Sequence, residues 1–278
     1  MDMSEILTIN HRRFGIHQYG IEQGFPVFYF HGFPGSRLDG VSLNFDNQAK
    51  NANCRVIAVD RPGVGFSDYV DDRKLLDYAD DIIRIADNLN INNFSVAGFS
   101  GGGPYALSVA FKIPERVQSV AFISGMGPMD FRECKKDNAM LVPKQTAAIR
   151  KLVAMFLQRA TAKKPATLSA LMKIILPMPD VRFLSSPKLE LFFIENFKQN
   201  ARGFLKDADI YRQPWGFSLS DIRTRVVLWH GSKDRNVSRR SAERIARELP
   251  NCKTNFLAGE GHFSLIGQHL TAILKQLR

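Results

Sequence analysis

The chain has 278 residues, of which 45% are hydrophobic and 23% are charged, and its formal net charge at pH 7 is +11. This is an ordinary globular composition, and no run approaches the roughly 20 uninterrupted apolar residues that a helix needs to span a bilayer. Cys54, Cys134 and Cys252 form no metal-like pair and the N-terminus lacks a signal-peptide pattern, so we expect free thiols and a cytoplasmic location.

The basic charge is concentrated between Gly125 and Trp215, which contain 16 Lys or Arg against 8 Asp or Glu. Such a segment can attract nucleic acid, a membrane surface or an anionic substrate. The charges interleave with apolar residues, which is typical of solvated helix faces, and no nucleic-acid motif accompanies them. We therefore expect a small-molecule substrate and no nucleic-acid partner; membrane-surface association stays open but unsupported, and the oligomeric state is not indicated.

Short apolar runs alternate with helical patterns, which predicts an α/β fold with a mainly parallel sheet covered on both faces. The predicted buried strands are rich in β-branched and aromatic residues and lie at 27–30, 56–59, 94–97, 117–123, 226–229 and, more weakly, 254–257. A pair near 6–9 and 14–19 predicts an antiparallel edge. Apolar residues recur at helical spacing at Leu75, Ala79, Ile82, Ile83 and Ala86, and again at Ile245 and Leu249.

Residues 126–215 interrupt this alternation and follow helical periods instead. One amphipathic helix is predicted at 149–160 and a second at 168–175, ended by Pro177 and Pro179. Ser186-Pro187 predicts the start of a third, whose apolar face would extend to Phe204. We expect a helical cap (lid) at 126–215, inserted after the sixth strand of a core formed by 1–125 and 216–278.

The strongest chemical signal is Gly98-Phe99-Ser100-Gly101-Gly102, which follows a predicted buried strand and precedes a predicted helix. In that context G-x-S-x-G predicts a nucleophilic serine on a sharp turn. Glycines at its flanks let neighbouring backbone approach closely, and the helix N-terminus favours developing negative charge. An ordinary turn is the alternative reading.

A serine hydroxyl needs a base to accept its proton and an acid to orient that base. His262 lies in a glycine-bracketed loop after the last predicted strand, so it is the candidate base; the other five histidines have positions that favour structural or surface roles. Asp234 lies just beyond a strand and follows Ser100 in the chain order expected for the acid. Asp130 obeys the same order and is the alternative, whereas Asp60 and Asp68 precede the serine.

The reaction also requires N–H donors for the oxyanion that forms on the substrate. The segment His31–Ser36 follows the strand at 27–30, and the backbone N–H of Phe33 is the candidate for one donor. The N–H of Gly101, directly after the nucleophile, is the candidate for the other. A simple turn rich in Gly and Pro is the alternative.

The ordered blocks His31–Ser36, Asp60–Ser67, Gly98–Gly103, Asp234 and Gly261-His262 resemble those of a single-domain protein of the α/β-hydrolase fold family. The resemblance covers about residues 25–121 and 225–278. It implies an eight-stranded, mostly parallel sheet flanked by helices, a serine-histidine-acid triad, and no metal or organic cofactor. The block Asp60–Ser67 is then a structural loop near the site.

The expected activity is hydrolysis of an ester-like or related acyl bond in a small, largely apolar substrate, through an acyl-enzyme. Phe99 and the cap residues Phe192, Phe193 and Phe197 are predicted to contact that substrate; core packing explains the cap residues equally well. Ser100 argues against relatives with an aspartate nucleophile. A proline iminopeptidase-like enzyme, a carbon–carbon bond hydrolase and a non-catalytic small-ligand sensor on the same fold stay open as alternatives.

Overall fold

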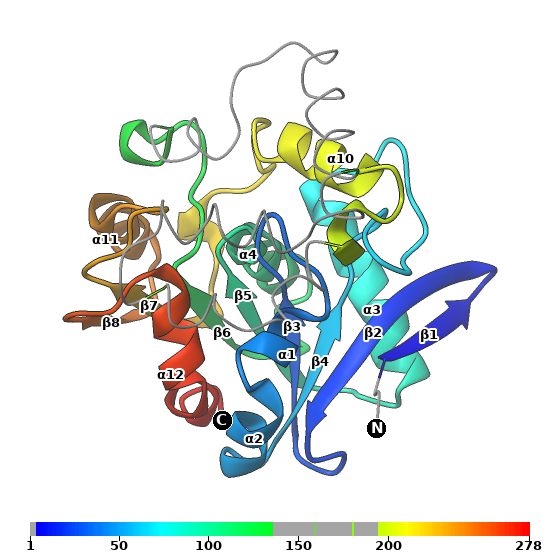
Figure 1. Cartoon of the computed structure of the whole chain (residues 1–278). Helices are drawn as coiled ribbons and strands as arrows, with labels where there is room; N and C mark the ends of the chain where they lie inside the picture. Colours follow the sequence, from blue (N-terminus) through cyan, green and yellow to red (C-terminus); the bar gives the residue numbers. More distant parts are fainter. Residues whose placement is uncertain (1–3, 136–158, 160–179, 181–193) are drawn as a thin grey trace.

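A computed structural model of the chain describes residues 4–135, 159, 180 and 194–278. They form one eight-stranded sheet with the strand order β1-β2-β4-β3-β5-β6-β7-β8 (Figure 1). The strands are β1 Ser4–Ile9, β2 Arg12–Gly20, β3 Phe25–Phe30, β4 Cys54–Val59, β5 Phe94–Phe99, β6 Val117–Ile123, β7 Arg225–Gly231 and β8 Cys252–Leu257.

All the strands expected from the sequence are confirmed, including the antiparallel edge formed by β1 and β2. The two residues that join these strands, Asn10 and His11, have φ of 49° and 63°. Left-handed backbone at both central positions produces the twist that a two-residue hairpin requires. The six strands from β3 to β8 run parallel to one another, so their carboxyl ends lie at the same edge of the sheet.

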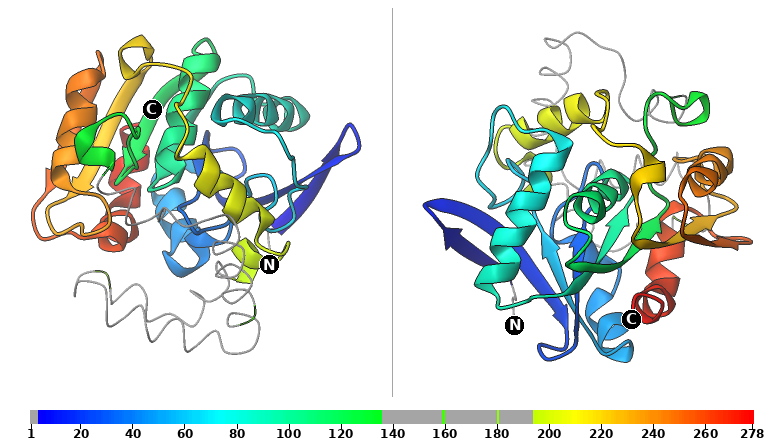
Figure 2. Two further views of the ribbon diagram at one scale, coloured as in Figure 1. Left: turned by 90° about the horizontal axis from the view of Figure 1, so that it is seen from above. Right: turned by 180° about the vertical axis from the view of Figure 1, so that it is seen from behind.

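Helices cover both faces of the sheet (Figures 1 and 2). They are α1 Asp39–Ser42, α2 Phe45–Asn51, the 3₁₀ turn η1 Leu75–Asp77, α3 Tyr78–Asn88, α4 Gly102–Lys112, α10 Arg202–Ile210, the 3₁₀ turn η2 Leu219–Asp221, α11 Arg239–Glu248 and α12 His262–Lys275. One apolar core lies between the sheet and α3, α4, α10 and α11, and a second lies between the opposite face and α2 and α12. Among the described helices none has the length and apolar character needed to cross a bilayer.

The predicted cap lies largely outside the described residues, including the helices expected at 149–160 and 168–175. Residues 194–197 of the third predicted helix are helical, but the prediction that this helix continues to Phe204 is wrong. Asn200 and Ala201 adopt φ of 54° and 57°, and a new helix, α10, begins at Arg202. At the break, the Gly65 N–H donates to the Glu195 carbonyl, the acceptor that a continuing helix would use for the Gln199 N–H. The Gln199 side chain also donates to the carbonyls of Gly65 and Ser67.

A buried charge cluster joins α10 to the rest of the fold. The carboxylate of Asp207 accepts hydrogen bonds from Arg61, Arg73 and Tyr105, and the side chains of Asp207 and Arg61 are fully buried. Burial opposes ionisation, yet the two guanidinium groups lower the pKa of Asp207 to about 2. The cluster holds together the loop after β4, helix α4 and α10.

We expect Asp207→Asn to destabilise the protein by roughly 3–5 kcal/mol, because it leaves two buried guanidinium groups without a counter-charge. Urea unfolding measures this. The matched control is Asp87→Asn, which breaks the 2.7 Å ion pair with Arg116 at a carboxylate that is 61% exposed. It should cost at most about 1 kcal/mol. Equal losses in the two variants would contradict the structural importance of the cluster.

Candidate active site

Ser100 lies directly after β5, at the carboxyl edge of the sheet, and has a φ of 53°. A non-glycine residue in left-handed backbone is strained, and it persists only where its surroundings hold it. Here the Ser100 N–H donates to the carbonyl of Ile123 at 2.9 Å, and its carbonyl accepts from the N–H groups of Gly103 and Met126, both at 3.0 Å. The serine is therefore held from both sides at the turn between β5 and α4.

Gly102 allows the helix after the serine to lie against the adjacent strand. A side-chain carbon at this position would lie 2.0 Å from the Phe30 carbonyl oxygen and 2.8 Å from that of His31. No side chain fits in that space, so glycine is required for the close approach of α4 to the end of β3. This contact places the start of α4 beside the loop that follows β3.

The two candidate oxyanion donors lie side by side. A side-chain carbon at Gly101 would lie 2.6 Å from Phe33 Cβ and 3.2 Å from Phe33 N, and one at Gly32 would lie 3.7 Å from Ser100 Cβ. Among the described residues neither the Phe33 N–H nor the Gly101 N–H donates a hydrogen bond. Tyr211 Oη donates to the Gly101 carbonyl at 2.8 Å, and the Tyr211 ring packs edge-on against Phe33.

His262 and Asp234 form a direct, buried pair. His262 Nδ1 lies 2.8 Å from Asp234 Oδ2, and the exposed fractions of the two side chains are 3% and 0%. Burial alone would raise the pKa of Asp234, but its interaction with His262, together with the backbone N–H of Val237, holds that pKa below its usual value. The His262 ring also lies 4.8 Å, between ring centroids, from Phe99, the residue that precedes Ser100.

The competing acidic residues lie elsewhere or have other partners. Asp130 is exposed and lines a separate groove with Trp215 and Phe217. Asp60 is buried against Arg37, and Asp68 pairs with Arg13 near the surface. Of these acids, only Asp234 has a described hydrogen bond to His262.

His31 orders the backbone of the loop after β3. Its Nδ1 lies 3.0 Å from the Gly32 carbonyl oxygen and its Nε2 accepts the Arg61 N–H at 3.2 Å. Burial, followed by the nearby Arg61 charge, lowers the pKa of His31 well below its usual value, so its ring is neutral. The sequence-based expectation of a structural role agrees with these contacts.

Arg61 binds the same loop through two hydrogen bonds. The sequence did not predict this role. Its Nη1 donates to the His31 carbonyl at 2.6 Å and its Nη2 to the Gly32 carbonyl at 2.8 Å, while Nε donates to Asp207. The loop that holds the Phe33 N–H is thus fixed by a guanidinium whose charge is balanced from α10. The pairing spans 146 residues of sequence, and no local pattern marks it.

The start of α12 has a further partner that the sequence did not indicate. The Asp180 carboxylate accepts hydrogen bonds from the backbone N–H groups of His262, Phe263 and Ser264, the first three residues of the helix. These N–H groups have no partner within a helix, so Asp180 caps the helix that carries His262.

The aromatic residues predicted to contact substrate have the following positions. Phe99 is buried and packs against His262 and Phe263. Phe197 is also buried, and its ring lies edge-on to Phe204, which stacks on Phe33. Phe192 and Phe193 lie outside the described residues. Phe197 therefore helps to pack α10 onto the loop of the candidate oxyanion donors, and its contact with substrate stays a prediction.

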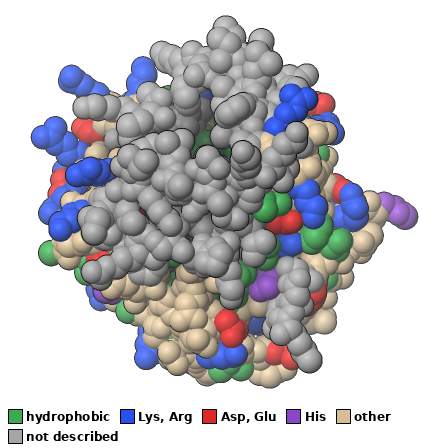
Figure 3. All heavy atoms as spheres, viewed as in Figure 1, with side chains coloured by type: hydrophobic (Ala, Val, Ile, Leu, Met, Phe, Trp, Pro, Cys, Tyr) green, Lys and Arg blue, Asp and Glu red, His purple; other side chains and the backbone are tan. Residues whose placement is uncertain are grey.

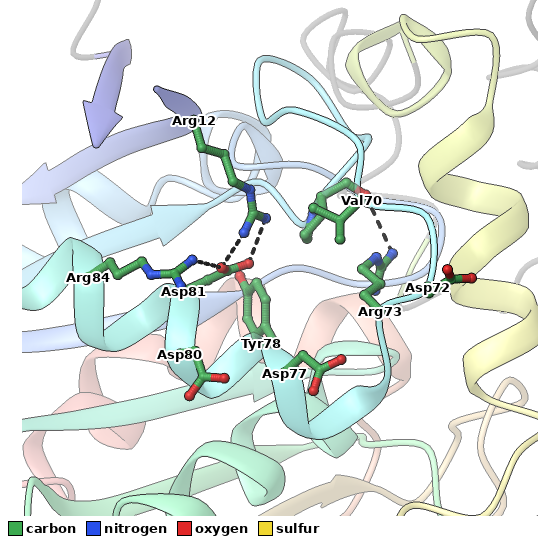
Figure 4. A pocket seen from close by; sticks show the side chains of 10 residues that line it. Arg12, Val70, Asp72, Arg73, Asp77, Tyr78, Asp80, Asp81 and Arg84 are labelled. Atoms are coloured by element: carbon green, nitrogen blue, oxygen red, sulfur yellow. Dashed lines mark hydrogen bonds and ion pairs between the residues drawn. The ribbon is translucent and has the colours of Figure 1, made fainter. Parts of the chain in front are cut away.

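A cavity of about 300 Å³ opens beside α3, away from these residues (Figure 4). Arg12 forms a two-pronged ion pair with Asp81 at its wall, and Arg84 approaches the same carboxylate. None of the residues that line the cavity is a candidate catalytic residue. Within the described part of the chain, no group of three or more His, Cys, Asp or Glu is arranged to hold a metal ion.

Basic side chains are spread over the described surface. In the view of Figure 3, Lys and Arg side chains lie at several places around the edge, with Asp and Glu side chains between them. On α11, Arg239 pairs with Glu243 and Arg244 with Glu248, one helical turn apart. These pairs are typical of a solvated helix face.

Comparison with known proteins agrees with this architecture. The family model for the alpha/beta hydrolase fold matches residues 26–268. The chain is 23% identical over 94% of its length to the 2-hydroxymuconate semialdehyde hydrolase of Pseudomonas putida, of which it covers 88%. It is 36% identical over 40% of its length to the dihydrolipoyllysine-residue acetyltransferase component of the acetoin cleaving system of the same organism, and it spans only 29% of that protein.

Among solved structures, an esterase from Exiguobacterium antarcticum superposes with a TM-score of 0.69 at 19% identity, covering 99% of this chain and 100% of the other. With the family match over most of the chain, the assignment is plain: the protein belongs to the α/β-hydrolase fold family. The eight-stranded, mostly parallel sheet and its flanking helices are those of this fold.

The loop after β3 is also held by a carboxyl group, at the start of α1, that should make stability depend on pH. Asp39 accepts hydrogen bonds from the Gly32 and Ser36 N–H groups, and burial raises its pKa to about 7. The folded protein therefore binds this proton more tightly than the unfolded chain, whose Asp pKa is near 3.9. The resulting stabilisation is complete below about pH 4 and is lost as the pH rises through about 7.

We expect the stability of Asp39→Asn relative to the natural protein to increase between pH 4 and 8, by up to about 4 kcal/mol, because the variant has no carboxyl group to ionise. Urea unfolding of both proteins across this range measures the difference, in which other titrating groups such as Asp60 largely cancel. A difference that is constant with pH would contradict the raised pKa.

Proposed function

We propose that the protein is a serine hydrolase that cleaves an ester-like or related acyl bond with Ser100 as nucleophile, His262 as base and Asp234 as the acid that orients the base. The observation that carries the proposal is the buried 2.8 Å contact between His262 Nδ1 and Asp234 Oδ2. The His262 ring also packs against Phe99, the residue before the strained turn of Ser100. A histidine held by one ring nitrogen presents the other, Nε2, as a base.

In the proposed reaction, His262 Nε2 removes the Ser100 proton as Oγ attacks the substrate carbonyl. The imidazolium that forms is stabilised by the ionised Asp234, and the N–H groups of Phe33 and Gly101 bind the oxyanion. The leaving group departs with the proton from His262, and water, activated by the same base, releases the acyl group from Ser100. Each oxyanion donor contributes roughly 100- to 1,000-fold in rate.

Several features support the assignment of the oxyanion donors. The Phe33 and Gly101 N–H groups have no acceptor among the described residues, and backbone donors held in this way need no reorganisation when charge develops. Arg61 fixes the carbonyls of His31 and Gly32 just before Phe33, and Tyr211 fixes the carbonyl of Gly101. Buried side chains thus fix the backbone carbonyls next to both donors.

The substrate is proposed to be small and largely apolar, since Phe99 and Phe263 lie beside His262. A second candidate activity, hydrolysis of a carbon–carbon bond next to a carbonyl, is favoured by the match along 94% of the chain to a 2-hydroxymuconate semialdehyde hydrolase. The two activities share an attack on a carbonyl carbon and differ in the atom that leaves.

The test is reaction with a fluorophosphonate probe together with hydrolysis of p-nitrophenyl esters of increasing acyl length. We expect one label per chain, located on Ser100 by mass spectrometry, and ester hydrolysis that Ser100→Ala lowers by roughly 10⁴-fold or more while the fold is retained. A folded protein that takes no label would favour a ligand-binding protein without catalysis. Cleavage of a 2-hydroxy-6-oxo dienoate much faster than any ester would favour the second activity.

The choice of acid is tested by substitution of the two aspartates that follow Ser100 in the chain. We expect Asp234→Asn to lower kcat by roughly 10³- to 10⁴-fold, because the base loses its orientation and the counter-charge of its imidazolium. Asp130→Asn, the matched control at an exposed carboxylate, should change kcat by less than about twofold. The opposite ranking would show that the wrong acid is proposed.

A further inference from the structure

We propose that Asp180 is a positioning residue for catalysis: its carboxylate fixes the first turn of α12 and thereby the imidazole of His262. The inference rests on the proposed function, because it assigns a role toward the proposed base. Asp180 lies 82 residues before His262 in sequence, within the segment predicted as the cap.

The contact is closely fitted. Asp180 Oδ2 accepts the His262 N–H at 3.0 Å, and Oδ1 accepts the N–H groups of Phe263 at 2.7 Å and Ser264 at 2.9 Å. Asp180 has no exposed surface. A carboxylate at a helix N-terminus also interacts favourably with the helix dipole. Charge-assisted bonds of this kind are about twice as strong as neutral ones.

Gly261 provides the space that this contact needs. A side-chain carbon at this position would lie 2.5 Å from Asp180 Oδ2 and 2.6 Å from Oδ1. Any other residue would displace the carboxylate, although the φ of −97° at Gly261 is accessible to every residue type. The glycine before His262 is thus explained by the approach of Asp180 and not by backbone conformation.

The location of the contact separates positioning from general stabilisation. His262 is the first residue of α12, so its backbone N–H is bonded to Asp180 while its ring Nδ1 is bonded to Asp234. Loss of the carboxylate would release the first turn and allow the ring to leave its 2.8 Å contact. A small displacement of a base is costly, because proton transfer requires hydrogen-bond distance.

The other end of α12 offers a matched control. Ser95 Oγ and Ser119 Oγ both donate to the carbonyl of Leu277, just after the helix, at 2.9 and 2.7 Å. Ser119→Ala removes a buried hydrogen bond to the same helical segment, but far from His262. If activity is lost only because α12 as a whole is less stable, Ser119→Ala should lose activity too.

The experiment compares the natural protein with Asp180→Ala, Asp180→Asn and Ser119→Ala. Thermal unfolding, kcat and KM for p-nitrophenyl butyrate, and the rate of fluorophosphonate labelling are measured for each. We expect Asp180→Ala to lower kcat and the labelling rate about 10-fold or more, with KM changed less than about threefold. Asp180→Asn, which keeps one acceptor oxygen, should recover part of the loss, and Ser119→Ala should stay within about twofold of the natural protein.

A second readout does not depend on activity. The proton shared by His262 Nδ1 and Asp234 should give a downfield ¹H NMR signal that is absent in His262→Gln. We expect this signal to broaden or shift in Asp180→Ala and to be unchanged in Ser119→Ala. An unchanged signal and an unchanged kcat in folded Asp180→Ala would overturn the proposal. Failure of the hydrolytic assignment is distinguishable, because the natural protein would then take no label while the NMR comparison still tests Asp180.

Discussion

The reversal of the chain from β5 into α4 leaves only Ser100 and Gly101 between strand and helix. This constraint forces Ser100 into left-handed backbone, and it requires helix α4 to begin against the carbonyls at the end of β3. The close approach is possible only because Gly102 has no side chain. Everything proposed for the site depends on this contact, since it brings the loop containing Phe33 against Gly101, the residue that follows the serine.

The loop after β3 has no regular structure of its own, so its shape is set by partners from distant parts of the chain. Arg61 binds two successive carbonyls, Asp39 binds two N–H groups, and Asp207 balances the charge of Arg61. A buried ion pair contributes little net stability on average, but loss of one partner is expensive. The cluster can therefore form only when the loop after β3 has one particular shape. A loop fixed in this way holds its backbone N–H donors in place before the reaction.

Two segments of the predicted cap reach the candidate site in different ways. Asp207, on α10, binds Arg61, which in turn binds the loop after β3. Asp180 binds the first turn of the helix that begins at His262. Each is a fully buried carboxylate with its hydrogen bonds satisfied by groups of the core. A buried polar group with all its hydrogen bonds satisfied makes the groups that it binds more rigid and gives them one defined orientation. We infer that the predicted cap contributes to the order of the candidate site itself, in addition to any contact with substrate.

The sequence by itself determined the strands, the family and the position of Ser100, because these depend on local signals. Apolar runs of β-branched residues predict buried strands, and G-x-S-x-G between a strand and a helix marks its turn. Parallel strands also place the residues that follow them at one edge, so His262 and Asp234 could be selected from their positions just beyond strands, together with chain order. The helix predicted through Phe204 does not continue that far, and at its end a distant loop takes the Glu195 carbonyl through the Gly65 N–H.

Only the tertiary structure decided which polar groups meet. The partners of Arg61, Tyr211 and Asp180 lie 146, 110 and 82 residues away in sequence, and neither periodicity nor composition specifies such pairings. An aspartate after two prolines reads in sequence as the end of a helix or a turn. It becomes the cap of α12 only because folding buries its carboxylate against three N–H groups that have no other partner.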